Sequence, residues 1–144
     1  MATTPLVLYN ALIRTHHIIS RRKVAILKAS AHKKSCYVLI RSGGCPGIMY
    51  CQGSEVTVKQ WVSEVQVGLC VTDARPDMLT GSKNLRYKDF SLASHPAPIT
   101  SQDRVAPITS QGRFIEVESV KDFARLMEGL GLLSWWRKAM RYDM

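Results

Sequence analysis

Residues 1–54 contain no aspartate or glutamate, although they contain eight basic side chains. The net charge of the whole chain is +9. A segment without carboxylates excludes a catalytic histidine that a local carboxylate orients. It favours a polyanionic partner, with nucleic acid ahead of an anionic membrane surface. The alternative is a solvated basic face that only aids solubility.

Short-spaced cysteine pairs are also missing. A zinc knuckle or ribbon draws two ligands from each tight turn, so the absence of any C-x-x-C pair among Cys36, Cys45, Cys51 and Cys70 excludes these sites. We therefore expect reduced, mostly buried thiols. No G-x-S-x-G, H-E-x-x-H or paired-carboxylate signature occurs either. We expect a protein that is not an enzyme and has no metal, no cofactor and no small-molecule substrate.

Long apolar runs are absent as well. No run approaches the ~20 residues that span a bilayer, and MATTPLVLYN lacks the basic flank and the cleavage site of a signal peptide. We expect an intracellular protein, in the nucleus or the cytoplasm, without membrane contact. Hydrophobic residues make up 46% and charged residues 22%, as in ordinary globular proteins, so residues 1–144 are expected to form a single domain.

Periodicity and turn residues predict the order strand, helix, strand, strand, helix, strand, followed by a helical tail. This order is the split βαβ pattern of an α+β ferredoxin-like domain, β-α-β-β-α-β: a four-stranded antiparallel sheet with two helices on one face and extra C-terminal helices. The strands are expected at 11–20, 35–40, 47–51 and 84–92, and the helices at 21–34 with Ser20 as N-cap, at 54–69, and in a tail over about 119–141 that breaks at Gly129 and Gly131.

Flexible loops are expected at about 70–84 and 92–112. The second loop contains the string APITSQ twice, at 97–102 and at 106–111. Two six-residue copies are too short for a solenoid unit, so we interpret them as a duplicated loop without a fold of its own. GRFIEVES, which follows, is expected to form a short extended piece.

The second face of the predicted sheet also needs a cover. In CYVLI and GIMYC, apolar residues occupy both alternating sets of positions, so neither face is expected to be in contact with water. The tail is the expected cover, through Leu132, Trp135 and Trp136.

The segment RSGGCPGIMYC, residues 41–51, is compatible with a phosphate loop, a reactive thiol or a hairpin turn. A Walker-type loop needs a lysine and a hydroxyl entering a helix, and this segment enters a strand. A phosphatase-like thiolate needs an arginine six residues after Cys45, where Cys51 stands, and no base is placed to activate the thiol. The G-x-x-G clamp of KH domains joins helices rather than strands. We therefore predict a hairpin, in which Gly43 and Gly44 permit positive φ.

The predicted first helix begins with three cations, Arg21, Arg22 and Lys23. The helix macrodipole already presents positive charge there, so each is unfavourable by roughly 0.3 to 1 kcal/mol. An anion at the helix start would explain them, because free backbone N–H groups and arginine together hold phosphate well. Alternatively, the side chains bend away and solvent screens them. By the same rule, exchanging Arg21 and Arg22 for glutamate is expected to keep or slightly raise thermal stability.

Four stretches resemble one known family. LIRTHHIIS, SGGCPGIMYCQGS with the tryptophan-bearing helix after it, LRYKDF, and EVESVKDFARLMEGLGLLSWWRKAM are similar to the C-terminal domain found after RWD domains. That domain is related to the C-terminal domain of a pre-mRNA-processing factor of the spliceosomal tri-snRNP. The similarity spans about residues 11–140 apart from the two loops, and is closest to free-standing fungal members. It implies a ferredoxin-like fold and, through the spliceosomal relatives, binding of small nuclear RNA, although no base-reading residue transfers by position.

These observations predict an RNA-associated binding module that holds phosphates through a basic surface patch and is largely indifferent to sequence. Stacking of bases on Tyr50 from an open sheet is the less favoured mechanism, because the tail is expected to cover that face. The rival hypothesis is a protein-protein interaction module, in which the tail or a sheet edge docks a protein partner. The residues expected to bind nucleic acid are Arg21, Arg22, Lys23, Lys28, Lys33, Lys34, Arg41, Arg86 and Lys88.

Overall fold

The computed structural model describes residues 8–16, 18, 21–67, 91–99 and 113–142. They form an α+β structure around one five-stranded sheet with the order β4-β1-β3-β2-β5. The strands are β1 (Tyr9–Thr15), β2 (Tyr37–Arg41), β3 (Gly47–Gly53), β4 (Ser91–Pro98) and β5 (Phe114–Val117). The helices are α1 (Arg21–Lys34), α2 (Glu55–Val67), α4 (Val120–Gly129) and α5 (Leu133–Met140).

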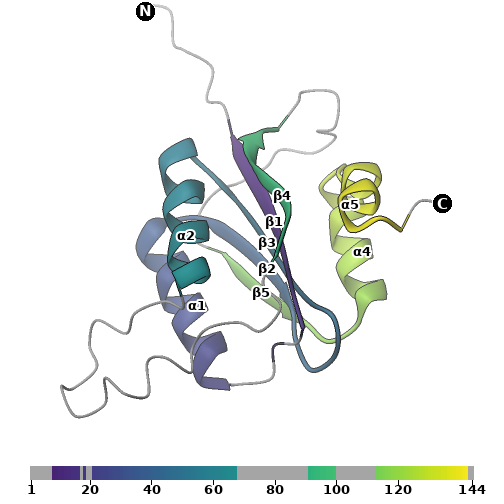
Figure 1. Ribbon diagram of the computed structural model, residues 1–144, viewed down its shortest axis with the longest axis horizontal. Coiled ribbons are helices and arrows are strands. Elements are labelled where there is room, and N and C mark those ends of the chain that lie inside the picture. The colour runs from purple at the N-terminus through teal and green to yellow at the C-terminus, as the bar shows by residue number, and fades with distance from the viewer. Residues whose placement is uncertain (1–7, 17, 19–20, 68–90, 100–112, 143–144) are drawn as a thin grey trace, which may run out of the picture.

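Helices cover both faces of the sheet, with α1 and α2 on one face and α4 and α5 on the other (Figure 1). Side chains alternate along a strand, so Ile13 and Met49 belong to the core beneath α1 and α2. Leu12 and Tyr50 belong to the core beneath α4 and α5. This arrangement explains why the central strands have no polar face. The prediction that the tail covers the second face is confirmed.

The glycine-rich segment is a hairpin turn, as predicted, because β2 and β3 on either side of it pair antiparallel. β3 also pairs antiparallel with β1, and every residue of β3 is buried. The first strand differs from its predicted range of 11–20. β1 ends at Thr15, opposite Gly47, because its partner β3 begins there.

β4 lies where the sequence predicts a loop, so the predicted loop at 92–112 is wrong for residues 92–98. The strand pairs with β1 at the edge of the sheet, with Pro98 opposite Tyr9. Proline cannot donate to a strand ladder, and SLASHPAP therefore looks like a loop, yet an edge strand tolerates proline. The first APITSQ copy begins inside β4.

Several predicted segments lie outside the described residues. These are the loop at 70–84, the second APITSQ copy, Ser20, and residues 84–90 of the expected fourth strand.

A fifth strand makes the sheet mixed, where the sequence predicts four antiparallel strands. β5 pairs in parallel with β2. Next to this ladder, the Val38 N–H donates to the Arg113 carbonyl over 2.8 Å and the Ser42 N–H donates to the Val117 carbonyl over 2.9 Å. The sequence predicts only an extended piece here, because nothing local in FIEV identifies its partner strand. β5 then leads the chain into α4 on the second face of the sheet.

The helix ends follow the local sequence signals. Ser54 Oγ accepts a hydrogen bond from the Thr57 N–H over 3.2 Å, and Ser119 Oγ accepts one from the Asp122 N–H over 3.0 Å. Gly131, with a φ of 77°, separates α4 from α5 near the predicted break. Among the helices that the structure describes, none is long and apolar enough to cross a bilayer.

Candidate nucleic-acid interface

Arg41 anchors the hairpin turn instead of extending into solvent. Its Nε donates to the Glu118 carbonyl and its Nη1 donates to the Pro46 carbonyl, both over 2.9 Å. The guanidinium lies against Gly44, where an added Cβ would come within 2.8 Å of Nη2. Gly44 therefore provides space, whereas Gly43, with a φ of +86°, provides the positive φ that was expected of both glycines. Two donors of Arg41 are thus engaged within the protein.

Cys45 is exposed at the hairpin turn, whereas Cys36 and Cys51 are buried. The expectation of buried thiols is confirmed for the latter two, and burial raises the pKa of the Cys51 thiol. Cys45 Sγ lies 3.9 Å from His16 Nδ1, so the expectation that no base stands near this thiol is wrong. Sequence spacing could not reveal this neighbour, because the pairing of β1 with β3 brings the two residues together. Cys70 lies outside the described residues.

A carboxylate from β5 lies beside Arg21 at the start of α1. Arg21 Nη2 donates to Glu116 Oε1 over 2.7 Å, and Nη1 donates to Oε2 over 2.8 Å. Oε2 also accepts a hydrogen bond from the Ser42 hydroxyl. The hydrogen bond from Arg21 is the main reason why the pKa of Glu116 is lowered. A carboxylate within the protein therefore supplies the anion that the basic helix start favours, and a phosphate would have to compete with Glu116 for Arg21, whose side chain is 68% exposed.

The flank of α1 that faces α2 is also neutralised. Lys34 Nζ lies 2.9 Å from Glu64 Oε1, and the Lys34 side chain is only 13% exposed. Ser30 donates to the same carboxylate over 2.9 Å. Lys23 shares this flank by helical spacing, and burial lowers the pKa of its ammonium group. Lys23 and Lys34 therefore face the protein more than the solvent.

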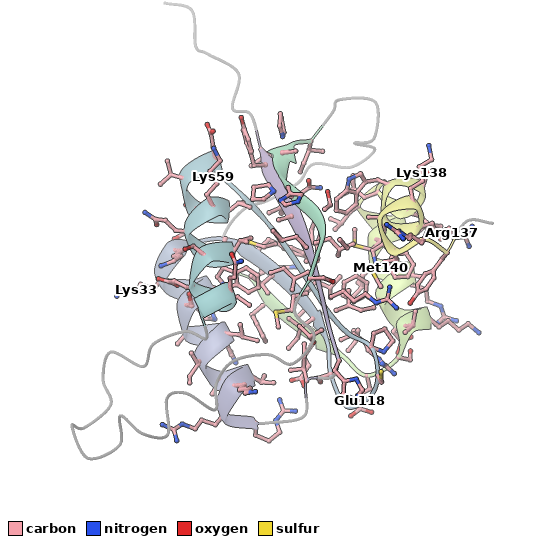
Figure 2. The ribbon with its side chains drawn as sticks, in the orientation of Figure 1. Lys33, Lys59, Glu118, Arg137, Lys138 and Met140 are labelled. Atoms are coloured by element: carbon pink, nitrogen blue, oxygen red, sulfur yellow. The ribbon has the colours of Figure 1, made fainter. Side chains whose placement is uncertain are left out.

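Three of the residues predicted to bind nucleic acid are exposed on α1: Arg22, Lys28 and Lys33. The buried stripe of the same helix consists of Val24, Leu27 and Ala31. Helical periodicity puts Arg22 and Lys33 opposite this stripe and Lys28 on the flank of Arg21. Figure 2 shows Lys33 directed away from the sheet. Within residues 8–67, 91–99 and 113–142, as far as they are described, no carboxylate pairs with any of the three.

The predicted basic patch therefore divides into parts. Its members on α1 that are exposed and have no carboxylate partner among the described residues are Arg22, Lys28 and Lys33. Its members that are held by other groups or partly buried are Arg21, Lys23, Lys34 and Arg41. Arg86 and Lys88 lie outside the described residues.

In the part of the chain that the structure places, helices cover both faces of the sheet and leave no open stacking platform. Tyr50 is fully buried, and its ring meets the Trp135 ring edge-on with centroids 5.7 Å apart. Its hydroxyl accepts a hydrogen bond from Asn10 Nδ2 over 3.3 Å and donates to Gln52 Oε1. Burial is also the main reason why the pKa of the Tyr50 hydroxyl is raised. The alternative in which bases stack on Tyr50 is therefore wrong for this conformation.

A second basic stripe lies on α5, outside the predicted patch. Arg137, Lys138 and Arg141 are exposed, whereas Trp136 is buried against the sheet. Figure 2 shows Arg137 and Lys138 on the side of the molecule opposite Lys33. The sequence signal is the spacing of the cations at i, i+1 and i+4, on the face away from the apolar residues.

No protein-family model matches the chain, and no curated protein is significantly similar to it. In the part of the chain that the structure describes, no group of three or more His, Cys, Asp or Glu side chains could hold a metal ion. The arrangement provides two separate sets of exposed cations, which attract phosphate or carboxylate groups.

Proposed function

We propose that this protein is a non-enzymatic, RNA-associated binding module that contacts phosphates through three exposed cations of α1. These are Arg22 and Lys33 on the outer face of the helix and Lys28 on the flank of Arg21, and together they are called the α1 stripe. The observation that carries this proposal is that these side chains are exposed and have no carboxylate partner among the described residues, whereas Arg21 and Lys34 on the same helix do. Unpaired cations lose no internal ion pair when they meet a phosphate, so their attraction contributes fully to binding.

The charge of the whole chain also supports a polyanionic partner. A net charge of +9, with no acid in residues 1–54, attracts RNA over a longer range than the individual contacts do. Binding of this kind is weak and insensitive to sequence, with a Kd on the order of 10⁻⁴ to 10⁻⁶ M at physiological salt.

The sequence resemblance to the domain found after RWD domains, and to its spliceosomal relatives, also supports RNA as the partner. The order β4-β1-β3-β2, with antiparallel neighbours, agrees with a ferredoxin-like core to which β5 and the C-terminal helices are added. A ferredoxin-like core is therefore part of the proposal. We also propose a location in the nucleus or the cytoplasm.

The proposal is tested with two triple variants of equal charge change. The first replaces the α1 stripe, Arg22→Gln/Lys28→Gln/Lys33→Gln. The control replaces three other exposed cations, Lys59→Gln/Lys121→Gln/Arg125→Gln. Lys59 and Arg125 form only exposed ion pairs within their own helices, which contribute little to stability.

Affinity for a single-stranded oligoribonucleotide is measured at several salt concentrations. Three phosphate contacts contribute about −2 to the slope of log K against log salt, so the α1 triple variant should lose about that much of the slope. The control should keep the wild-type slope. Equal losses in both variants would show that only net charge matters, and the absence of RNA binding in the wild type would favour the protein-protein interaction hypothesis.

A further inference from the structure

The exposed face of α5 carries positive charge along its whole length after Ser134. Arg137, Lys138 and Arg141 follow Ser134 at helical spacing, and all four are exposed. We call the three cations the α5 stripe. Among the residues that the structure places, none offers them a carboxylate partner. The opposite face of the helix is buried through Trp136 and Met140, so the stripe is fixed on the outside.

Arg141 occupies a backbone position that favours glycine. α4 and α5 end with the same pair of hydrogen bonds, in which one residue donates to the carbonyl three positions before it and the next donates to the carbonyl five positions before it. The residue with positive φ in this motif is Gly131 after α4, at 77°, and Arg141 after α5, at 62°. A non-glycine residue is strained there, and α1 ends in the same way, with Ser35 at a φ of 54°.

Tyr142 follows Arg141, and its ring lies against Trp136 at the end of α5. Its N–H donates to the Arg137 carbonyl over 2.8 Å, and its ring meets the Trp136 ring edge-on with centroids 5.4 Å apart. The residue is nevertheless 41% exposed. The ring is therefore held in position by the end of α5 while part of it remains open to solvent.

We propose that the α5 stripe and Tyr142 form a second site, for single-stranded RNA, in which the cations hold phosphates and an unpaired base stacks on Tyr142. The inference rests on the proposed RNA function but uses different residues from the α1 stripe. Positive grooves combined with exposed aromatic rings are how proteins bind single strands without sequence preference. A duplex hides the faces of its bases, and an acidic peptide would use the cations but not the ring.

The two sites lie on opposite sides of the sheet, as the positions of Lys33 and of Arg137 and Lys138 show (Figure 2). Each site therefore contributes separately to the salt dependence of binding, and each can be removed without touching the other.

The charge contribution is tested with Arg137→Gln/Lys138→Gln/Arg141→Gln, compared with the same control, Lys59→Gln/Lys121→Gln/Arg125→Gln. For a single-stranded oligoribonucleotide, the α5 triple variant should lose about 2 from the slope of log K against log salt, and the control should lose none.

The ring is tested separately, with a measurement that a merely electrostatic surface would not affect. Tyr142→Ser should weaken single-strand binding about fivefold or more at every salt concentration without changing the slope, because stacking is not ionic. Tyr142→Phe keeps the ring and should bind like the wild type. Arg141→Gly should raise the melting temperature, since it relieves the positive φ, while it weakens RNA binding.

The possible results separate this inference from the proposed function. The second site would be overturned, and the first kept, if only the α1 triple variant lost RNA affinity or if Tyr142→Ser bound RNA like the wild type. If only the α5 variants lost RNA affinity, the α1 stripe would have no part in the proposed function and the second site would be kept. Equal binding of duplex and single strand, or equal competition by oligoglutamate of the same charge, would also overturn the single-strand assignment. Absence of RNA binding in the wild type would overturn both.

Discussion

Glu116 connects the start of α1 to the end of β2. Its carboxylate joins Arg21 at the helix start to Ser42 after β2, and it comes from β5. The macrodipole rule describes only the helix itself and cannot include a carboxylate that lies 95 positions further along the chain. The pairing of β5 with β2 is what brings Glu116 to this place.

This contact reverses the stability expected for a substitution at Arg21. Arg21→Glu would place a second carboxylate next to Glu116, so we expect a lower free energy of unfolding, although the sequence alone predicts an unchanged or higher one. Arg22→Glu has no carboxylate opposite it among the described residues, so it should keep or slightly raise the free energy of unfolding. Urea denaturation of the two variants measures the difference. Equal stabilities would show that the contact with Glu116 is not maintained in solution.

The same contact has a defined pH dependence. Because the hydrogen bond from Arg21 lowers the pKa of Glu116 in the folded protein, its stabilisation is complete above the ordinary glutamate pKa of about 4.3. It is lost as the pH falls through the lower, folded value. The wild type should therefore have a higher free energy of unfolding than Glu116→Gln at pH 7. This difference should become smaller as the pH falls below about 4. A gap that stays constant over this range would argue against an ionised Glu116.

At the scale of the element, the helices could be predicted and two of the strands could not. The period of the buried stripe in α1 and the caps at Ser54 and Ser119 are local signals, and they place the helix ends near their observed positions. The sequence does not predict β4, because its prolines are typical of loops and its pairing with β1 is irregular. β5 was hidden because a four-residue strand is defined by its partner rather than by its own sequence.

The packing of α5 depends on one of two adjacent tryptophans. Trp136 is 2% exposed and stacks on Phe123 with ring centroids 5.6 Å apart, whereas Trp135 is only partly buried. Trp136→Ala should therefore lower the free energy of unfolding by about 3 to 5 kcal/mol in urea denaturation, and Trp135→Ala by clearly less.

Trp136→Phe is the conservative control for this prediction. It keeps an aromatic ring in the core, and it loses no hydrogen bond to the described residues because Trp136 Nε1 has no partner among them. Trp136→Phe should therefore lower the free energy of unfolding much less than Trp136→Ala does. A loss as large in Trp135→Ala as in Trp136→Ala would mean that α5 does not pack in the observed orientation.

At the scale of the whole molecule, the charge asymmetry of the sequence is only partly kept in the fold. The basic first third and the acids of the later part meet at Arg21 with Glu116 and at Lys34 with Glu64. Composition predicts a basic surface, and helical period predicts which cations of α1 point outward. Which cations are neutralised depends on contacts between distant elements, and no local pattern contains this information. The α1 stripe is what remains of the predicted patch after these contacts are counted.

The position of RNA on the folded protein tests the central claim most directly. Backbone amide shifts are recorded by ¹H–¹⁵N NMR while a single-stranded oligoribonucleotide is added at low and at high salt. We expect shifts around Arg22, Lys28 and Lys33 at low salt that diminish strongly at high salt. Amides of α1 that do not move at low salt, or that move equally at both salt concentrations, would contradict it.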